Sequence, residues 1–410
     1  MATWTEYLGN PAYVIEHGGA PFDATRMSGS LTGDAGAATE ACIAGPGSLR
    51  NRRRHAIDFA RCSYLGLDRH PLTIATAIEA IEAQRASGRA RIDVDLMGEL
   101  EETLSTLFCA RVLVTSSAML ANMGAMPILA AGQLTGGRKP VVAFDSLAHV
   151  SLAYHKPMIT DRTQVETIAH NDMDALESLC RKHPLVAYVC DGVCPFAENA
   201  PIAALHQLQE RYGLFLYIDD AHGISLFGTH GEGFARSQMP QLLGERTIVA
   251  ASLAKGFGAS GGILMLGEAR HETLFKMRSI PHVFSSTPGP AAIGAALGSS
   301  KIHRSAELGQ RQMYLADRLA LFDSCIATAQ QGNSLPLRMV AIKSEANALS
   351  VANGVLFDGF LVTALPAKRQ DVSGIRICIT AEHEASDIAR LCKSILANVA
   401  ETTRKPYPLR

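Results

Sequence analysis

A single lysine is set among unusually small residues. Lys255 follows an apolar run in the segment ASLAKGFGASGG, residues 251–262, which has glycine at positions 256, 258, 261 and 262. A surface lysine in a glycine-rich turn is the simplest interpretation. A second is nucleotide binding, because GFGASG matches the G-x-G-x-x-G pattern that follows a strand in dinucleotide-binding folds. That pattern requires a helix to begin at the glycines, whereas GGILMLG continues here as another apolar strand.

The third interpretation is a lysine that forms a Schiff base with pyridoxal phosphate (PLP). An amine that attacks an aldehyde and later moves a proton needs a flexible stem and small neighbours, which let a planar cofactor approach. Gly256 and Gly258 meet this need, and Ser252, three residues before the lysine, is available to a phosphate. This hypothesis predicts that further cofactor-binding residues occur elsewhere in the chain.

Three such residues follow other apolar runs. A pyridine nitrogen stays protonated beside a buried carboxylate, and Asp219 of YIDDAH ends a predicted strand. His222, three residues on, is placed to hydrogen-bond a phenolic oxygen, and His149 of FDSLAHVSL is placed to stack on a ring. A histidine at a strand end is more often a structural group, so the hypothesis depends on the combination.

The elements that must position these residues alternate along the chain. From about residue 110 to 267, short apolar runs such as LVAYVCDG and LFLYIDDAHG alternate with amphipathic segments such as AALHQLQERYG. The order strand, helix, strand predicts an α/β fold with a mostly parallel central sheet. Because the runs are continuously apolar, we expect the strands to be buried on both faces.

Polar residues follow most of these predicted strands. In an open α/β sheet the ligand crevice lies beyond the carboxyl ends of the strands, so these residues would converge on one site. Alternatively, each of them caps the helix that follows. The residues are Ser116, Ser117, Asp145, Asp191, Asp219, Asp220 and Ser252.

Three regions are expected along the chain. Residues 1–56 form an N-terminal arm and linker, in which the small, glycine-rich stretch 28–48 predicts a flexible link. Residues 57–295 form the large PLP-binding domain. Residues 296–410 form a smaller α+β domain, because helical text leads into the strand-like runs LRMVAIKS, FLVTAL and GIRICIT and then into a last helix.

The composition indicates a small-molecule partner. Of 410 residues, 47% are hydrophobic and 19% charged, and the formal net charge of −1 offers no attraction to nucleic acid or an anionic membrane. Nine cysteines without C-x-x-C spacing predict neither a disulfide framework nor a zinc site, and no metal is expected. The N-terminus lacks a signal-peptide pattern and no apolar run is long enough for a membrane span, so we expect a cytoplasmic protein.

Six segments together resemble the α-oxoamine synthase family. YIDDAHGISLFGTHGEG resembles the family's DEAHG segment, ASLAKGFGASGG its T-x-x-K-x-x-G lysine segment, and DSLAHVSL its D-x-x-SHASL. SYLGLDRHP, HND at 170–172 and FSSTPGPAAIGAAL are similar to further family motifs, in the same order, over about residues 57–400. The resemblance implies a PLP-dependent transferase of fold type I, generally a homodimer with active sites at the subunit interface. Such enzymes condense an amino acid with an acyl-CoA and release CoA and CO2.

The resemblance also implies roles residue by residue. Lys255 would bind the cofactor covalently and carry protons, Asp219 would face the pyridine nitrogen, His222 would contact the phenolic oxygen, and His149 would stack on the ring. Arg376 in GIRICIT would grip the amino-acid carboxylate, although without the motif it is an ordinary strand arginine. Further cofactor contacts are implied for Ser252, Asp191, the backbone around Ser117, Ala118 and Met119, and Ser286 or Thr287 from the other subunit.

The substrates depend on segments that depart from the family pattern. The glycine stretch is shortened to SGRARIDVDLMGELEE without its histidine, and Ala118 and Met119 replace a glycine and an aromatic residue. These departures and the segment 353–380 look closest to the quorum-sensing α-hydroxyketone autoinducer synthases, which join a medium-chain acyl-CoA to a small amino acid. The alternatives are 8-amino-7-oxononanoate synthase, glycine C-acetyltransferase and serine palmitoyltransferase. Two alternatives from other classes remain: an oxidoreductase that binds NAD(P) through GFGASG, and a regulatory protein that keeps the fold without the activity.

Overall fold

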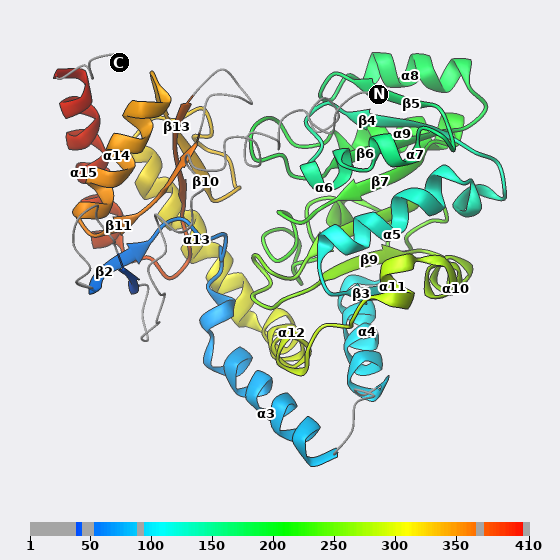
Figure 1. The fold of residues 1–410 in the computed structure, drawn as a ribbon, viewed down its shortest axis with the longest axis horizontal. Helices are drawn as coiled ribbons and strands as arrows, with labels where there is room; N and C mark the ends of the chain where they lie inside the picture. Colours follow the sequence, from blue (N-terminus) through cyan, green and yellow to red (C-terminus); the bar gives the residue numbers. More distant parts are fainter. Residues whose placement is uncertain (1–37, 43–52, 88–93, 366–372, 405–410) are drawn as a thin grey trace. The chain divides into compact units, whose positions relative to one another are not determined.

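The chain divides into two compact units. The computed structural model describes residues 38–42, 53–87, 94–365 and 373–404 (Figure 1). One unit comprises Leu67–Gly309, and the other joins the described residues up to Gly66 to those from Gln310 onwards. The described residues before Leu67 thus belong to the same unit as those after Gly309. The expected domain limits, 57–295 and 296–410, stay a prediction.

A seven-stranded sheet forms the centre of the unit Leu67–Gly309. Only β9 runs antiparallel to its neighbours, while the five strands from β8 to β5 are parallel to one another (Figure 1). This arrangement confirms the predicted α/β fold with a mostly parallel sheet. In spatial order the strands are β3 (Arg111–Thr115), β9 (Gly262–Leu266), β8 (Thr247–Ser252), β7 (Phe215–Asp219), β6 (Val186–Asp191), β4 (Val141–Asp145) and β5 (Val165–Ile168).

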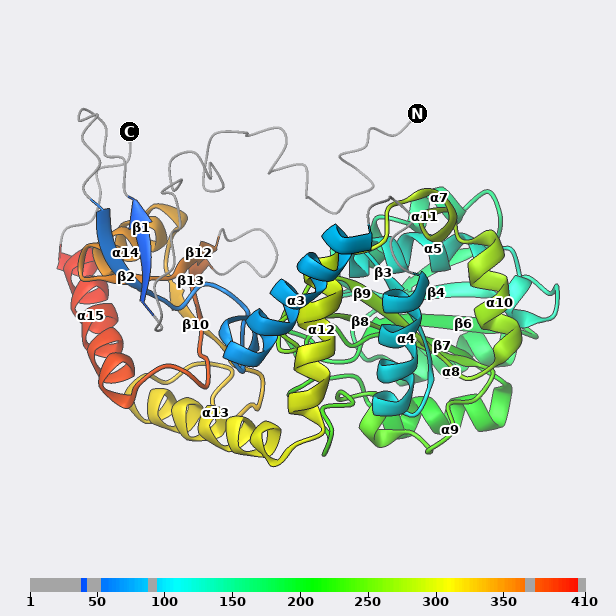
Figure 2. The ribbon, with the colours of Figure 1, turned by 90° about the horizontal axis from the view of Figure 1, so that it is seen from below.

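Helices cover both faces of this sheet (Figure 2), and the strands formed by the predicted apolar runs are largely buried, whereas the edge strand β5 is partly exposed. On β7, Phe215 and Tyr217 pack toward α5, whereas Leu216 and Ile218 pack on the opposite face toward α9. The helices of this unit are η1 (Leu67–Arg69), α3 (Pro71–Ser87), α4 (Val94–Phe108), α5 (Ala118–Ala130), η2 (Gln133–Thr135), α6 (Val150–Ala153), α7 (Lys156–Ile159), α8 (Met173–Lys182), α9 (Ile202–Tyr212), η3 (Arg236–Gln238), α10 (Ala269–Arg278), α11 (Ile280–Phe284) and α12 (Pro290–His303).

The second unit has the predicted α+β character. One sheet has the order β10 (Leu337–Ile342), β13 (Ser373–Cys378) and β12 (Thr363–Leu365), and all its pairs are antiparallel. Its register places Arg376 of β13 opposite Met339 on one side and Thr363 on the other. The helices are α13 (Ala306–Cys325), which begins in the other unit, α14 (Glu345–Phe357) and α15 (Ala385–Arg404).

A second small sheet corrects one prediction from the sequence. The stretch 28–48 is expected to be a flexible link, but Ala38–Cys42 forms strand β1, which pairs antiparallel with β2 (Arg53–Asp58). On its other side, β2 pairs with β11 (Phe360–Leu361). The prediction was wrong at these five residues because strand pairing satisfies backbone groups whatever the side-chain size. The rest of the stretch lies outside the described residues.

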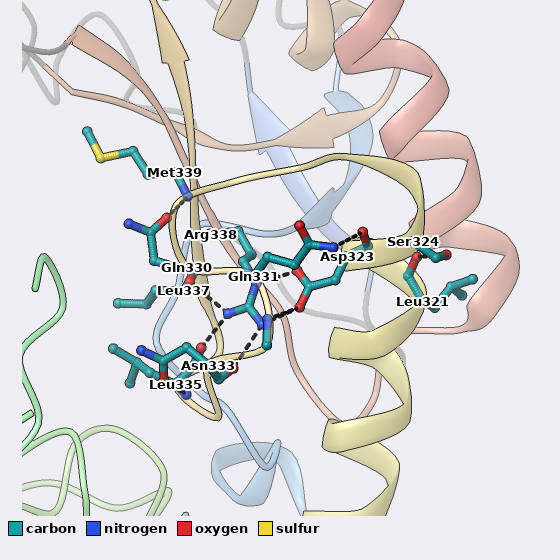
Figure 3. A network of polar contacts seen from close by, with 11 residues as sticks. Leu321, Asp323, Ser324, Gln330, Gln331, Asn333, Leu335, Leu337, Arg338 and Met339 are labelled. Atoms are coloured by element: carbon teal, nitrogen blue, oxygen red, sulfur yellow. Dashed lines mark hydrogen bonds and ion pairs between the residues drawn. The ribbon is translucent and has the colours of Figure 1, made fainter. Parts of the chain in front are cut away.

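A buried guanidinium ties α13 to the start of β10 (Figure 3). Arg338 donates from Nε to Oδ1 of Asp323 at 2.6 Å and from Nη2 to Oδ2 at 2.8 Å. Its other N–H groups reach the carbonyl oxygens of Leu335 (2.7 Å), Leu337 (3.0 Å) and Asn333 (2.9 Å), so all five donors are used. This network fixes the beginning of the strand that pairs with the Arg376 strand.

Three further observations concern the described residues only. None of their helices is both long and apolar enough to cross a membrane. No disulfide joins the eight cysteines whose side chains the structure describes. They hold no group of three or more His, Cys, Asp and Glu side chains arranged to bind a metal ion.

Candidate active site

Three neighbouring parallel strands end at one edge of the large sheet. Asp191 closes β6, Asp219 closes β7 and Ser252 closes β8. The register pairs Asp191 with Asp219 and Asp219 with Ala250, and the N–H of Gly192 donates to the carbonyl of Asp219 at 2.7 Å. The predicted convergence of polar strand ends is therefore met by these three residues.

The lysine lies in a tight loop directly after β8. Backbone hydrogen bonds close this loop from Leu253 N to Gly261 O at 3.0 Å, and Gly258 N donates to Lys255 O at 2.9 Å. Gly258 has φ +72°, and a Cβ there would lie 2.4 Å from the backbone of Leu67, so only glycine fits. No helix begins at these glycines, since β9 starts at Gly262, and the loop is therefore not a dinucleotide-binding turn.

The loop brings Lys255 to one of the predicted histidines. The distance between Nζ of Lys255 and Nε2 of His222 is 2.8 Å, and the contact is partly buried. His222 follows β7 by three residues, so the lysine and histidine come from the ends of adjacent strands. An amine held against an imidazole at the carboxyl edge of a parallel sheet is suited to proton transfer.

The carboxylate of Asp219 has a fixed orientation. The side chain is 5% exposed, and both of its oxygens accept hydrogen bonds. Ala221 N donates to Oδ1 at 3.0 Å, and Nδ2 of Asn122 donates to Oδ2 at 2.9 Å. Asn122 was not among the predicted site residues. Its signal in the sequence is one amide within the otherwise apolar α5.

His149 caps the N-terminus of the short helix α6 and is held by its neighbours. Its backbone N–H donates to Oδ1 of Asp191 at 3.2 Å. Its ring Nδ1 lies 2.8 Å from Oγ of Ser151 and accepts from the backbone N–H of Ser151 at 3.2 Å. Oγ of Ser151 in turn accepts from Nδ2 of Asn122 at 3.0 Å, so the imidazole and the Asp219 carboxylate share one amide.

The acidic groups at this edge repel one another. Burial raises the pKa of Asp191 well above its ordinary value, and the charge of Asp219 raises it further; the His149 N–H and the charge of Lys255 oppose this shift. Burial likewise raises the pKa of Tyr217, assisted by Asp219. A cationic ring nitrogen beside Asp219 would relieve this repulsion, so the donor set fits a protonated pyridine.

The N-terminus of α5 lies at the same edge and fits a phosphate. Ser117 caps this helix, accepting from Leu120 N at 3.2 Å, and Ala118 and Met119 are its first two residues. The first N–H groups of a helix lack intrahelical partners and attract anions. A Cβ at Gly262 would lie 2.3 Å from Ser117 and Ala118, so glycine is what lets the helix start approach β9.

Three predicted site residues, Ser286, Thr287 and Arg376, are not shown beside Lys255 by any contact within the described part of the chain. Ser286 and Thr287 lie in an exposed loop after α11, where the carbonyl of Ser286 accepts from the hydroxyl of Ser116 in the same chain. Their predicted role across a subunit boundary stays a prediction. Arg376 belongs to the other compact unit, where Nη2 contacts Ala60 O at 3.5 Å and the buried Nε has no hydrogen-bond partner among the described residues.

Two strand-end aspartates do not join the site, which corrects the expectation that all of them converge. Asp145 accepts from the Tyr188 hydroxyl at 2.8 Å and from the backbone N–H groups of Leu147 and Asn171 at 2.7 and 3.0 Å. Asp220 accepts from Ala235 N at 2.9 Å. Both carboxyls fix loops, because buried backbone N–H groups require acceptors.

Comparison with known proteins agrees with this geometry. Residues 54–395 match the family described as "Aminotransferase class I and II". The 8-amino-7-oxononanoate synthase of Maricaulis maris is 31% identical over 359 residues, covering 84% of this chain and 87% of that protein. The enzyme of the same name from Geobacter sulfurreducens is 29% identical, covering 80% and 85%.

Solved structures show the same fold at low identity. Serine palmitoyltransferase of Sphingomonas wittichii has a TM-score of 0.78 and 18% identity, covering 99% of this chain and 100% of that one. The 8-amino-7-oxononanoate synthase of Francisella tularensis has a TM-score of 0.68 and 16% identity, covering 85% and 99%. These likenesses confirm the predicted fold type I.

The chain belongs to the class I and II aminotransferase family. Within that family its relatives place it among the α-oxoamine synthases, the PLP-dependent acyltransferases that the sequence motifs resemble. The predicted family, reaction class and cofactor are thereby confirmed, and the oxidoreductase alternative is excluded. The autoinducer synthase subgroup, in contrast, stays a prediction.

Proposed function

We propose that this enzyme joins a small amino acid to a medium-chain acyl-CoA, with release of CoA and CO2, to give an α-aminoketone of the kind used as an autoinducer precursor. The observation that carries the catalytic assignment is the contact of 2.8 Å between Lys255 and His222, beside the oriented carboxylate of Asp219. In this proposal the protein acts in the cytoplasm as a homodimer.

Each residue of the site has a defined task. When bound, PLP supplies a protonated ring that accepts electron density from the amino-acid Cα. Asp219 would hold the ring nitrogen through a hydrogen bond and keep it protonated. His149 would hold the face of the ring, and His222 would hold its phenolic oxygen. Nζ of Lys255 removes the proton from Cα and later returns one.

The proposal assigns further residues to the phosphate and to the substrate. Ser252 and the N–H groups of Ala118 and Met119 would hold the phosphate. Arg376 binds the amino-acid carboxylate, and its buried Nε, which lacks a partner among the described residues, supports this role. A fixed carboxylate orients the Cα–H bond for abstraction by the lysine.

The choice of acyl chain rests on sequence rather than geometry. The segment 353–380 and the shortened glycine stretch resemble the autoinducer synthases. The relatives named 8-amino-7-oxononanoate synthase favour a second candidate, condensation of alanine with the dicarboxylic C7 acyl thioester that this product name requires. Glycine C-acetyltransferase and serine palmitoyltransferase activities remain further alternatives.

A substrate grid decides between these candidates. CoA release is measured for acyl-CoAs of two to sixteen carbons, including the dicarboxylic C7 thioester, each with glycine, alanine, serine and 2-aminobutyrate, and products are identified by mass spectrometry. We expect the highest kcat/KM for a neutral medium-chain acyl-CoA with 2-aminobutyrate. A preference for the dicarboxylic thioester with alanine would establish the second candidate instead.

The role of Lys255 has its own test. The PLP-loaded protein should absorb at Schiff-base wavelengths, be bleached by borohydride and carry the reduced adduct on the peptide that contains Lys255. Lys255→Ala should abolish the adduct and lower turnover by at least about 10²-fold, since it removes both the covalent link and the proton carrier. A coloured, borohydride-sensitive Lys255→Ala protein would contradict the assignment.

Failure of the wild type to exchange the α-proton of any amino acid for deuterium would indicate a regulatory protein.

A further inference from the structure

One buried amide lies between two side chains of the site. Asn122 of α5 is 0% exposed and has three polar contacts. Its Nδ2 donates to Asp219 Oδ2 at 2.9 Å and to Ser151 Oγ at 3.0 Å, and its Oδ1 accepts from the Tyr217 hydroxyl at 2.7 Å. Ser151 Oγ then reaches Nδ1 of His149 at 2.8 Å.

The chemistry of these groups fixes the direction of every hydrogen bond. A carboxylate only accepts, so the Asn122 amide must present its NH₂ group to Asp219, which leaves its oxygen for the Tyr217 hydroxyl. Both amide hydrogens are then used. Nδ1 of His149 accepts from the backbone N–H of Ser151, so this nitrogen carries no proton and the Ser151 hydroxyl donates to it.

The positions of the four residues follow from the fold. Tyr217 precedes Asp219 by two residues on β7, and alternate strand residues face the same side of a sheet. That side is covered by α5, so the amide of Asn122 reaches both. Ser151 in α6 and Tyr217 are also buried, at 6% and 0% exposed. A chain of hydrogen bonds in such an environment is strong, and an unsatisfied member of it is costly.

We propose that Asn122, held by Tyr217 and acting through Ser151, is a positioning residue that orients the Asp219 carboxylate and fixes His149 as its Nε2–H tautomer. The significance for catalysis rests on the proposed function, in which Asp219 faces the ring nitrogen and His149 stacks on the ring. A neutral imidazole stacked there places no second cation beside the protonated pyridine, so the ring keeps its proton and its capacity to accept electrons.

Two variants of this chain test the proposal, with one control. Tyr217→Phe removes only the hydroxyl that holds the amide oxygen, and Asn122→Ala removes the amide. Met126→Ala on the same helix is the matched control, because Met126 is fully buried in the apolar core of this face and its side chain carries no N–H or O–H group. If Asn122→Ala does not fold, Tyr217→Phe still reports on the network.

The first measurement needs no cofactor. ¹⁵N-detected NMR of the apoprotein, with the His149 signals assigned by their loss in His149→Gln, reports which ring nitrogen carries the proton. We expect Nε2–H alone in the wild type and in Met126→Ala, and a mixture of tautomers in Asn122→Ala and, to a smaller degree, in Tyr217→Phe. A single Nε2–H tautomer in all variants would overturn the proposal.

The second measurement uses the PLP-loaded enzyme. The midpoint of its absorbance titration with pH should shift by on the order of one pH unit in Asn122→Ala, by less in Tyr217→Phe, and by none in Met126→Ala. Equal shifts in Asn122→Ala and Met126→Ala would reduce the effect to general destabilisation and overturn the proposal. Absence of any Lys255 adduct in the wild type would instead refute the proposed function, while the tautomer measurement would still decide the role of Asn122.

Discussion

Two adjacent aspartates, Asp219 and Asp220, have different surroundings and different proposed roles. Asp219 faces α5 and takes two N–H donors, which prepares its carboxylate for a cationic partner. Asp220 is bonded to Ala235 N in a space lined by Gly192, Gly223 and Gly233. A Cβ at Gly223 would lie 2.0 Å from Oδ1 of Asp220, so glycine is needed for the carboxyl to fit. One strand end thus supplies both the carboxyl proposed to bind the cofactor and a structural one.

The pH dependence of stability should reveal the buried Asp220. Burial raises the pKa of Asp220 to about 7 from the ordinary 3.8, although the N–H groups of Ala235 and Phe234 oppose the shift. A raised folded-state pKa means that the folded protein binds the proton more tightly. Its contribution is therefore fully present below pH 3.8 and is lost as the pH rises through about 7.

Asp220→Asn, which mimics the protonated carboxyl, should remove this dependence. Between pH 4 and 8 the wild type should lose up to about 4 kcal/mol of unfolding free energy that the variant keeps. Urea unfolding at pH 5 and pH 8 measures the difference. Parallel stability profiles for the two proteins would show that Asp220 is ionised in the folded state throughout this range.

At the level of elements, local pattern predicted the strands and their polar ends but not all of their partners. The run LFLYIDDAHG placed Asp219 and His222 correctly at a strand end, because a continuously apolar run followed by polar residues is a local signal. Asn122 gave no such signal, since its partners Tyr217 and Ser151 come from other elements and meet it only through tertiary packing. For the same reason the pattern could not separate Asp219 from Asp145, which binds a loop.

The link between α13 and β10 has a predictable effect on stability. Asp323→Ala leaves the buried guanidinium of Arg338 without its carboxylate, which costs about 3–5 kcal/mol of unfolding free energy. The pair of Arg390 and Asp387 offers a control, because its arginine is 62% exposed and its aspartate 14%, against 0% and 10% for Arg338 and Asp323. Asp387→Ala should cost less than about 1 kcal/mol.

Urea unfolding followed by circular dichroism compares these two variants. A double variant, Asp323→Leu with Arg338→Met, should recover only part of the loss, because it also leaves the carbonyls of Asn333, Leu335 and Leu337 without their donors. Equal and small effects of Asp323→Ala and Asp387→Ala would mean that the backbone carbonyls alone satisfy Arg338.

At the scale of the whole molecule, an apolar surface remains uncovered on a single chain. It lies on and just before α11 and consists of Met277, Ile280, Val283 and Phe284, which are 68%, 62%, 46% and 79% exposed. Contiguous exposed apolar side chains of this size mark interaction surfaces. The loop with Ser286 and Thr287 follows directly, so a partner that covers the patch would lie beside the residues expected to cross a subunit boundary.

We therefore predict that a second copy of this chain covers the patch. Phe284→Asp should raise the dimer dissociation constant by at least about 30-fold, because a buried aromatic residue at an interface contributes about 2 kcal/mol or more. Light scattering coupled to size-exclusion chromatography over a dilution series measures the change. Leu242→Asp is the matched control, since Leu242 is 84% exposed on the same unit but lies outside the patch.

Where Phe284→Asp becomes monomeric it should also bind PLP more weakly at low protein concentration, because the predicted Ser286 or Thr287 contact is lost. A dimer that tolerates Phe284→Asp as well as Leu242→Asp would place the subunit boundary elsewhere.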